Sequence, residues 1–300
     1  MKKLVSQVNN SQLTLKKFKR KMLIISDLDG TLLNDESKLS PLTINVVKKI
    51  SEQGHLFCIA TGRNTHGSLD IYKKLNLKTI LINLNGSYIW HPYDKNLLPI
   101  NIAFNKELVK RLVLEKNIFG HLNNIIAESY NAMYILNKPS KLEEIEELNE
   151  LFKINVNITE NQFYGKKHLL NMKMDPNTVL LQLKNPKYLD EVVYYIKQRF
   201  NTFVVRSWSL PNAGNIIEIN TKFANKGNGV DFLTSYYGIS KDSTISFGDG
   251  ENDIDLLRKT RFSYAMKNGS STAKLIARYI TSKTNDQDGV AIELIKIFMK

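Results

Sequence analysis

One stretch near the start constrains the fold more than any other: residues 23–33 read LIISDLDGTLL. Its apolar run is typical of a buried strand, and the run ends in two aspartates, Asp27 and Asp29. Gly30 favours a turn there, and the Thr31 hydroxyl can bond to its own backbone. Because open α/β sheets bind ligands beyond the carboxyl ends of their strands, the stretch predicts an α/β sheet with a site at this edge. The plainer alternative is a polar turn after a strand.

The following residues continue the alternation of strand and helix. A helix is expected to begin at Pro41, and the apolar run at 56–60 then leads into Thr61 and Gly62. A strand–helix–strand unit of this length requires a parallel crossover, which brings Thr61 to the same sheet edge as Asp27. A hydroxyl followed by a glycine amide can hold a phosphoryl oxygen, although a Thr–Gly pair alone usually marks a turn.

The alternation changes after the turn dipeptide Asn85–Gly86. Helices and strands typical of an α+β domain with an antiparallel sheet are then expected, at about residues 105–117 (helix), 124–136 (strands), 141–152 (helix), 178–183 (strand), 187–200 (helix), 203–208 and 215–219 (strands). We therefore expect an α/β core made of residues 22–86 and 220–300. An inserted α+β domain occupies 87–219, and a basic tail occupies 1–21.

A second acidic stretch, Gly248–Asp253, follows an expected strand at 244–247 and reads GDGEND. Three acids in six residues would repel a phosphate, and the carboxylates of Asp27 and Asp29 would repel each other. Both repulsions are relieved if a cation lies between the acids or if a carboxyl is protonated. Mg²⁺ prefers a few carboxylates together with water and phosphate oxygens. Asp27, Asp29 and Asp249 are therefore candidate Mg²⁺ ligands, and the alternative for the second stretch is a solvated acidic turn.

Lys226 opens an expected helix between the insert and the acidic stretch. A fixed ammonium can offset the negative charge of a phosphate and several carboxylates. A lone lysine is usually a solvated surface residue, so its place in the chain is what makes Lys226 a candidate.

These four stretches, in this order, resemble the motifs of the haloacid dehalogenase superfamily of phosphohydrolases, and most closely its Cof-type branch with a large α/β (type IIB) cap. The similarity covers the chain from about Met22 to its end. It implies a Rossmann-like, doubly wound parallel-sheet core with an inserted α+β cap domain. The cap is expected to act as a lid that selects the phosphoester, while the core performs the chemistry.

The resemblance also assigns roles to residues. Asp27 resembles the nucleophile that forms an aspartyl phosphate, and Asp29 the general acid and base. The implied ion ligands are the carboxylates of Asp27 and Asp249 and the carbonyl of Asp29. The implied phosphate-binding and supporting residues are Thr61, Gly62, Asn85, Lys226 and Asn252, with Asp253 just outside the ligand set. Lys267 stands where the family often has glycine, so the loop near Asn268 is expected to differ.

The sequence thus predicts a Mg²⁺-dependent phosphomonoester hydrolase for small phosphorylated metabolites, with sugar phosphates as the expected substrates. One alternative is a phosphomutase of the phosphomannomutase type, which shares the superfamily motif. Another is a non-catalytic regulator that binds phosphorylated ligands, although binding alone needs no nucleophile. We expect a cytoplasmic protein, monomeric or weakly homo-oligomeric, with no nucleic-acid or membrane partner.

The net charge, the cysteine and histidine content and the apolar stretches add further constraints. Seven of the 13 net positive charges fall in residues 1–21, so the tail is a solvated extension, a targeting signal or a nucleic-acid arm. The only cysteine, Cys58, excludes an internal disulfide and is expected to be a buried, inert thiol in a reducing compartment. The five histidines are scattered, which argues against a zinc site, and no apolar stretch reaches the roughly 18 residues of a membrane span.

Overall fold

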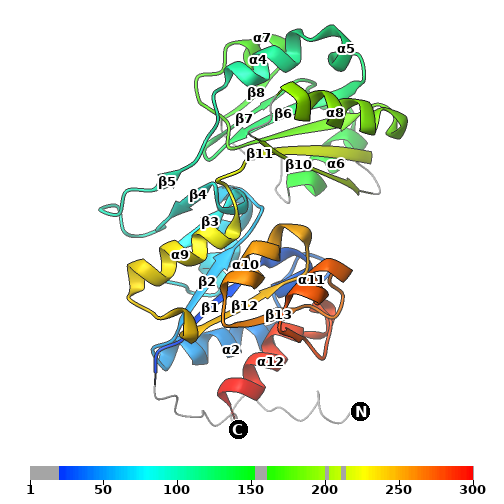
Figure 1. Cartoon of the computed structure of the whole chain (residues 1–300). Coiled ribbons are helices and arrows are strands. Elements are labelled where there is room, and N and C mark those ends of the chain that lie inside the picture. The colour runs from blue at the N-terminus through cyan, green and yellow to red at the C-terminus, as the bar shows by residue number, and fades with distance from the viewer. Residues whose placement is uncertain (1–19, 153–160, 200–202, 211–213, 300) are drawn as a thin grey trace. The chain divides into compact units, whose positions relative to one another are not determined.

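The computed structural model describes residues 20–152, 161–199, 203–210 and 214–299, and these residues form two compact units (Figure 1). Unit 1 comprises the described residues up to Gly62, residues 69–98 and those from Asn225 onward. Unit 2 comprises residues 63–68 and 99–224. Apart from Arg20 and Lys21, the expected tail lies outside the described residues.

Unit 1 is an α/β unit. Its strands are β1 (Leu23–Ser26), β2 (Leu56–Ala60), β3 (Leu81–Asn83), β4 (Tyr88–Trp90), β12 (Thr244–Gly248), β13 (Phe262–Ala265) and β14 (Tyr279–Ile280). Its helices are α2 (Pro41–Glu52), the later turns of α3 (Thr65–Lys74), α9 (Lys226–Tyr237), α10 (Ile254–Lys259), α11 (Ser271–Ile276) and α12 (Gly289–Phe298).

The strands of unit 1 lie in the order β14-β13-β12-β1-β2-β3-β4, and neighbouring strands are parallel except for β3 and β4. In this register Ser26, the last residue of β1, lies opposite Ile59 of β2 and Phe247 of β12. The carboxyl ends of three strands therefore meet at one edge. The expected parallel crossover, which delivers Thr61 beside Asp27, is confirmed.

Helices cover both faces of this sheet. Leu81 of β3 packs in a cluster with buried side chains of α2, α3 and α12. The next residue, Ile82, points to the opposite face because successive strand residues alternate. There its Cδ1 lies where a Cβ on Gly229 of α9 would stand. Helices on both faces of a mostly parallel sheet make unit 1 a doubly wound, Rossmann-like fold.

The inserted domain begins later than the sequence-based boundary at Ser87. β4 pairs with β3 in antiparallel register, Ile82 opposite Ile89, so residues 88–90 extend the sheet of unit 1. The longer segment of unit 2 starts at Pro99, just before the two-residue strand β5 (Ile100–Asn101). A three-residue strand is too short to show a hydrophobic period, so the sequence contained no signal for β4.

Unit 2 is an α+β unit with its own sheet, in the order β10-β11-β9-β6-β7-β8. The pairs are antiparallel, apart from β7 with β8. Its strands are β6 (Leu122–Ser129), β7 (Ala132–Ile135), β8 (Gln162–Tyr164), β9 (Thr178–Leu183), β10 (Phe203–Leu210) and β11 (Gly214–Thr221). Its helices are α4 (Glu107–Leu114), α5 (Lys116–Phe119), α6 (Leu142–Phe152), α7 (Lys166–Leu170) and α8 (Leu189–Arg199).

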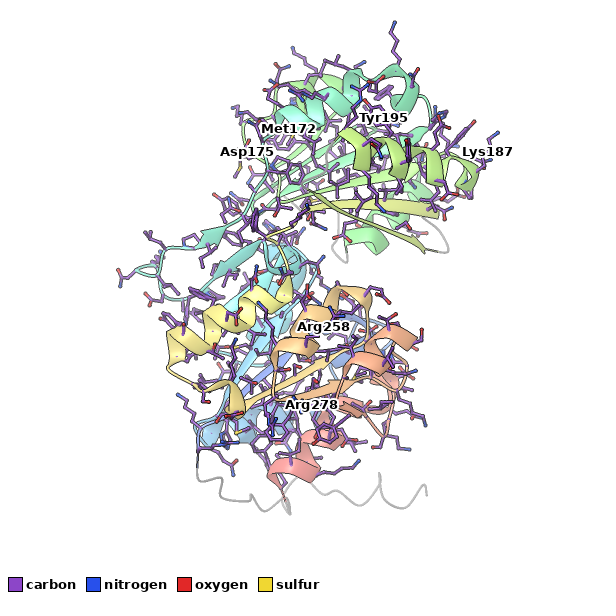
Figure 2. The ribbon with its side chains drawn as sticks, in the orientation of Figure 1. Met172, Asp175, Lys187, Tyr195, Arg258 and Arg278 are labelled. Atoms are coloured by element: carbon purple, nitrogen blue, oxygen red, sulfur yellow. The ribbon has the colours of Figure 1, made fainter. Side chains whose placement is uncertain are left out.

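Both faces of the unit 2 sheet are covered. One face packs on α4, α7 and α8 and carries Met172 in its core (Figure 2). The other face carries a smaller cluster that includes Leu148 of α6. On α8 the hydroxyl of Tyr195 donates to Glu115 Oε2 at 2.6 Å. Glu115 is extended (ψ 101°), which divides the expected helix at 105–117 into α4 and α5. β8 and α7 lie in residues 162–170, where no helix or strand was expected from the sequence.

Cys58 lies in β2 and is fully buried as a free thiol. Burial raises the pKa of this thiol to about 12, so it is uncharged near neutral pH. No helix within the described ranges is both long enough and apolar enough to cross a membrane.

Candidate active site

The site is built around the end of β1. The four residues of β1 are buried, and Asp27, the next residue, is only 5% exposed. Its backbone N–H donates to the carbonyl of Phe247 in β12. Gly30 then turns the chain with φ +67°, and a Cβ at that position would lie 2.5 Å from Asp249 Oδ2. A glycine is needed here both for the left-handed backbone and for the close approach of the Asp249 carboxylate.

β12 places Asp249 beside this turn. The Thr31 hydroxyl donates to Asp249 Oδ1 at 2.7 Å. Instead of bonding to its own backbone, as its place in a turn allows, the hydroxyl thus donates to a carboxylate 218 residues away in sequence. Asp253 Oδ2 accepts from the backbone N–H groups of Asp249 and Gly250, at 2.9 and 3.0 Å. These bonds fix the acidic loop after β12.

Lys226 is fully buried and joins two of these acids. Its Nζ lies 2.7 Å from Asp27 Oδ1 and 2.6 Å from Asp253 Oδ1. The lysine is the first residue of α9, and Asn225 caps that helix by accepting from the Asn228 N–H at 2.8 Å. The cap fixes the start of the helix, and hence the position from which Lys226 extends.

The charged groups of this cluster shift one another's pKa values. Burial raises the pKa of the Asp27 carboxyl, while the Lys226 ammonium acts to lower it. Burial, followed by the negative charge of Asp253, raises the pKa of Asp249 to about 6. Burial alone would lower the pKa of Lys226, but the carboxylates of Asp253 and Asp27 outweigh it and raise that pKa. One ammonium thus faces several acids, and the pKa values of Asp27 and Asp249 stay raised in its presence.

A divalent cation fits this arrangement. Carboxylate oxygens of Asp27, Asp249 and Asp253 all lie within 4.8 Å of one another. Because Asp253 already accepts from Lys226 and two backbone N–H groups, the carboxylates of Asp27 and Asp249 are the better candidates to hold an ion. Asp29 is near enough for its charge to contribute to the raised pKa of Asp249. A cation between these groups would favour their charged forms.

A second group of predicted residues meets beside β2 and β3. The backbone of Thr61 is fixed on both sides, because its N–H donates to Ile82 and its carbonyl accepts from the Asn85 N–H. Asn85 is left-handed (φ +55°), and its Oδ1 accepts from Asn252 Nδ2 at 2.9 Å. A Cβ on Gly62 would stand 3.2 Å from that same Oδ1. Thr61, Gly62, Asn85 and Asn252 thus lie together in unit 1.

The sequence analysis did not assign a site role to Thr31 or to Asn268. Asn268 Nδ2 donates to the Gly30 carbonyl at 2.7 Å, and its Oδ1 accepts from the Asn285 N–H at 3.0 Å. The neighbouring Lys267 donates its backbone N–H to the Thr281 hydroxyl at 2.9 Å. Threonine hydroxyls and asparagine amides are common in turns, so the residue types alone did not indicate that these two side chains reach the acidic cluster.

Comparison with known proteins identifies relatives of this chain. The sequence pattern of the haloacid dehalogenase-like hydrolases matches residues 24–294. The chain is 30% identical over 277 residues to the 5-amino-6-(5-phospho-D-ribitylamino)uracil phosphatase YitU of Bacillus subtilis, covering 92% of this chain and 97% of the relative.

Two solved structures share the fold. One is a haloacid dehalogenase-like hydrolase from Bacteroides thetaiotaomicron, with a TM-score of 0.77 and 22% identity, covering 93% of this chain and 100% of the other. The other is the subclass IIB sugar phosphatase BT4131, with a TM-score of 0.73 and 21% identity, covering 92% and 99%.

Proposed function

This chain belongs to the haloacid dehalogenase-like hydrolase family and is a phosphatase. From that premise we propose that it is a member of the Cof-type branch with a type IIB cap, and we propose a specific activity. The protein is a Mg²⁺-dependent phosphomonoester hydrolase that acts on small phosphorylated metabolites through an aspartyl phosphate on Asp27. The observation that carries the proposal is the buried cluster in which Asp27 contacts Lys226 and lies close to Asp249.

The proposed reaction has two steps. In the first, a carboxylate oxygen of Asp27 bonds to phosphorus while the bond to the leaving oxygen breaks, and Asp29 gives its proton to that oxygen. In the second, water bonds to phosphorus, Asp29 takes the proton of the water, and the Asp27 carboxylate leaves. Inorganic phosphate is released and both acids return to their starting states.

The other residues of the cluster hold charge in place. We propose that Mg²⁺ is held by the carboxylates of Asp27 and Asp249 and the carbonyl of Asp29, where it would stabilise negative charge on the phosphoryl oxygens. Lys226 orients the Asp27 carboxylate and offsets its charge. Thr61 and the Gly62 N–H form the cradle for a phosphoryl oxygen, with Asn85 and Asn252 beside it.

Two substrate types have support from relatives. The Bacillus relative is named for a substrate that carries a phosphorylated ribityl chain on a uracil ring, and a solved structure of the same fold is named as a sugar phosphatase. A ribityl phosphate and a sugar phosphate are both phosphate esters of a polyhydroxylated carbon chain. We propose that this protein accepts that class, with sugar phosphates as the first substrates to test.

The test begins with p-nitrophenyl phosphate and Mg²⁺, with and without a chelator. A panel of sugar phosphates and 5-amino-6-(5-phospho-D-ribitylamino)uracil is then scored for free phosphate. The proposal expects Mg²⁺-dependent release of phosphate, with at least one polyol ester preferred over the generic substrate. Conversion of a sugar 6-phosphate into its 1-phosphate isomer without release of free phosphate would identify a phosphomutase. Binding of phosphoesters without turnover would identify a non-catalytic regulator.

A further inference from the structure

Glu128 is a buried acid that the proposed chemistry does not use. It lies near the end of β6 in unit 2 and is 4% exposed. Its Oε1 accepts from Asn64 Nδ2 at 2.6 Å. Burial raises the pKa of Glu128 to about 7, while the hydrogen bond from Asn64 acts to lower this pKa and the negative charge of Glu218 in β11 acts to raise it. Burying a carboxyl costs free energy unless hydrogen bonds compensate it, and Asn64 supplies such a bond.

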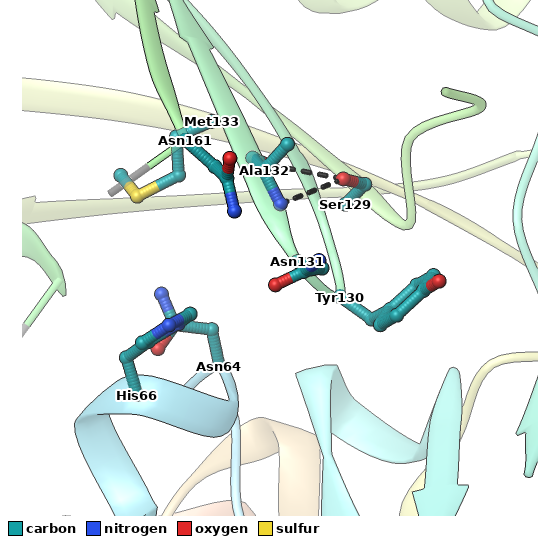
Figure 3. A pocket seen from close by; sticks show the side chains of 8 residues that line it. All are labelled: Asn64, His66, Ser129, Tyr130, Asn131, Ala132, Met133 and Asn161. Carbon is teal, nitrogen blue, oxygen red and sulfur yellow. Dashed lines mark hydrogen bonds between the residues drawn. The ribbon is translucent and has the colours of Figure 1, made fainter. Parts of the chain in front are cut away.

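The partner of Glu128 is held at both ends of its carboxamide. Asn64 Oδ1 accepts from the Gly67 N–H at 2.8 Å, which caps the first turn of α3, while Nδ2 donates to Glu128. The next residue adds a second attachment, because the Thr65 hydroxyl donates to the Tyr130 carbonyl at 3.0 Å. Figure 3 shows Asn64 facing the turn between β6 and β7, where Tyr130 lies. Residues 63–68 are thereby fastened to the β6–β7 turn inside unit 2.

This segment directly continues the proposed phosphoryl cradle. Gly62 precedes Asn64 by two residues, and consecutive Cα atoms are about 3.8 Å apart, so the two Cα atoms are separated by at most about 7.6 Å. On its other side the cradle is fixed by the backbone bonds of Thr61 to Ile82 and Asn85. The Asn64–Glu128 bond is the corresponding attachment on the carboxyl side.

We propose that Glu128 is a positioning residue: by holding the Asn64 carboxamide, it fixes the backbone at Gly62 in the conformation that binds a phosphoryl oxygen. The proposal rests on the proposed role of Thr61 and Gly62 as the cradle. Glu128 does not touch the phosphoryl group, so its effect is on phosphate binding through the conformation of the cradle.

Two substitutions separate this role from a merely structural one. Glu128→Leu has a similar volume but cannot accept from Asn64, whereas Glu128→Gln keeps an acceptor oxygen. The control is Thr178→Val, which removes the 2.8 Å bond from Thr178 to Asn220. Thr178 lies opposite Glu128 in the same sheet and is equally buried, but its hydroxyl bond does not reach residues 63–68.

The readouts are the inhibition constant of inorganic phosphate, its dissociation constant by calorimetric titration with Mg²⁺ present, and the melting temperature. Glu128→Leu should weaken phosphate binding by about tenfold, and Glu128→Gln should stay within about twofold of the wild type. Thr178→Val should lower the melting temperature and leave phosphate binding unchanged. If Glu128→Leu does not fold, Asn64→Ser takes its place, because serine still caps α3 but is too short to reach Glu128.

Two results overturn the proposal: wild-type phosphate binding in folded Glu128→Leu or Asn64→Ser, or an equal loss of binding in Thr178→Val. A wild-type protein that neither binds phosphate nor hydrolyses phosphoesters overturns the proposed function itself, and with it the cradle on which this role depends. Active wild type with an unaffected Glu128→Leu variant rejects only the role of Glu128.

Discussion

Replacing Glu128 with glutamine should remove a pH-dependent part of the stability of unit 2. The carboxyl is buried, and burial raises its pKa from 4.5 to about 7. The folded state therefore binds this proton more tightly than the unfolded state. The resulting stabilisation is fully present below about pH 4.5 and is lost as the pH rises through about 7. A glutamine cannot titrate, so the variant should not show this loss.

The size of the effect follows from the shift. At 1.36 kcal/mol per pKa unit, the rise corresponds to about 3 kcal/mol between pH 5 and pH 8. For a unit of this size, that is a difference in melting temperature of about 10 °C. Glu128→Gln and the wild type should melt at similar temperatures at pH 5, and the variant should melt higher by that amount at pH 8.

Scanning calorimetry at pH 5, 6, 7 and 8 measures this difference. The matched control is Glu293→Gln in unit 1, at the other buried glutamate among the described residues. Although burial acts to raise the pKa of Glu293, bonds from Lys296 and Ser282 lower it. Its stabilisation is therefore present at neutral pH and lost on acidification, so this variant should melt lower than the wild type at pH 8. A Glu128→Gln difference that is constant from pH 5 to pH 8 would refute the reasoning.

Three further predictions concern unit 1. Asp27→Asn keeps the shape of the nucleophile without its charge. Turnover of p-nitrophenyl phosphate should therefore fall by several orders of magnitude, while the circular dichroism spectrum stays unchanged. Near-normal turnover would falsify covalent catalysis by Asp27. Ca²⁺ accepts six to eight oxygens and binds both oxygens of a carboxylate, so it should occupy the site and inhibit, and equal rates with Ca²⁺ and Mg²⁺ would contradict the double role of Asp27. Gly30→Ala places an alanine in a left-handed conformation, with its Cβ 2.5 Å from Asp249 Oδ2. The affinity for Mg²⁺, measured by calorimetry, should therefore fall by about tenfold or more. Wild-type affinity in this variant would show that the acidic loop can move aside.

The core could be predicted from sequence because its signals are local. The apolar run of β1 ends at Asp27, the run of β2 ends at Thr61, and that of β12 ends at Asp249. Chain chirality and the crossover rule then bring these strand ends to one edge without further information. The existence and fold of the inserted α+β unit followed similarly from the change in periodicity.

What the sequence did not reveal depends on contacts between distant residues. The bond from Thr31 to Asp249 spans 218 positions and involves a residue type common in turns. The bond from Asn64 to Glu128 leaves no periodic trace, because a lone acid in a strand usually faces solvent. β4 and β8 are three residues each, which is below the length at which alternation can be recognised.

The single buried cysteine can serve as a probe of the rate at which unit 1 unfolds. Cys58 is in β2 of unit 1, and the sequence provides no other thiol. A thiol-reactive dye added in excess can modify it only when unit 1 opens, because the buried thiol is uncharged and inaccessible in the folded state. The labelling rate therefore reports the opening of unit 1 alone. Under the same conditions, Glu128→Gln should leave that rate unchanged, whereas Glu293→Gln should increase it.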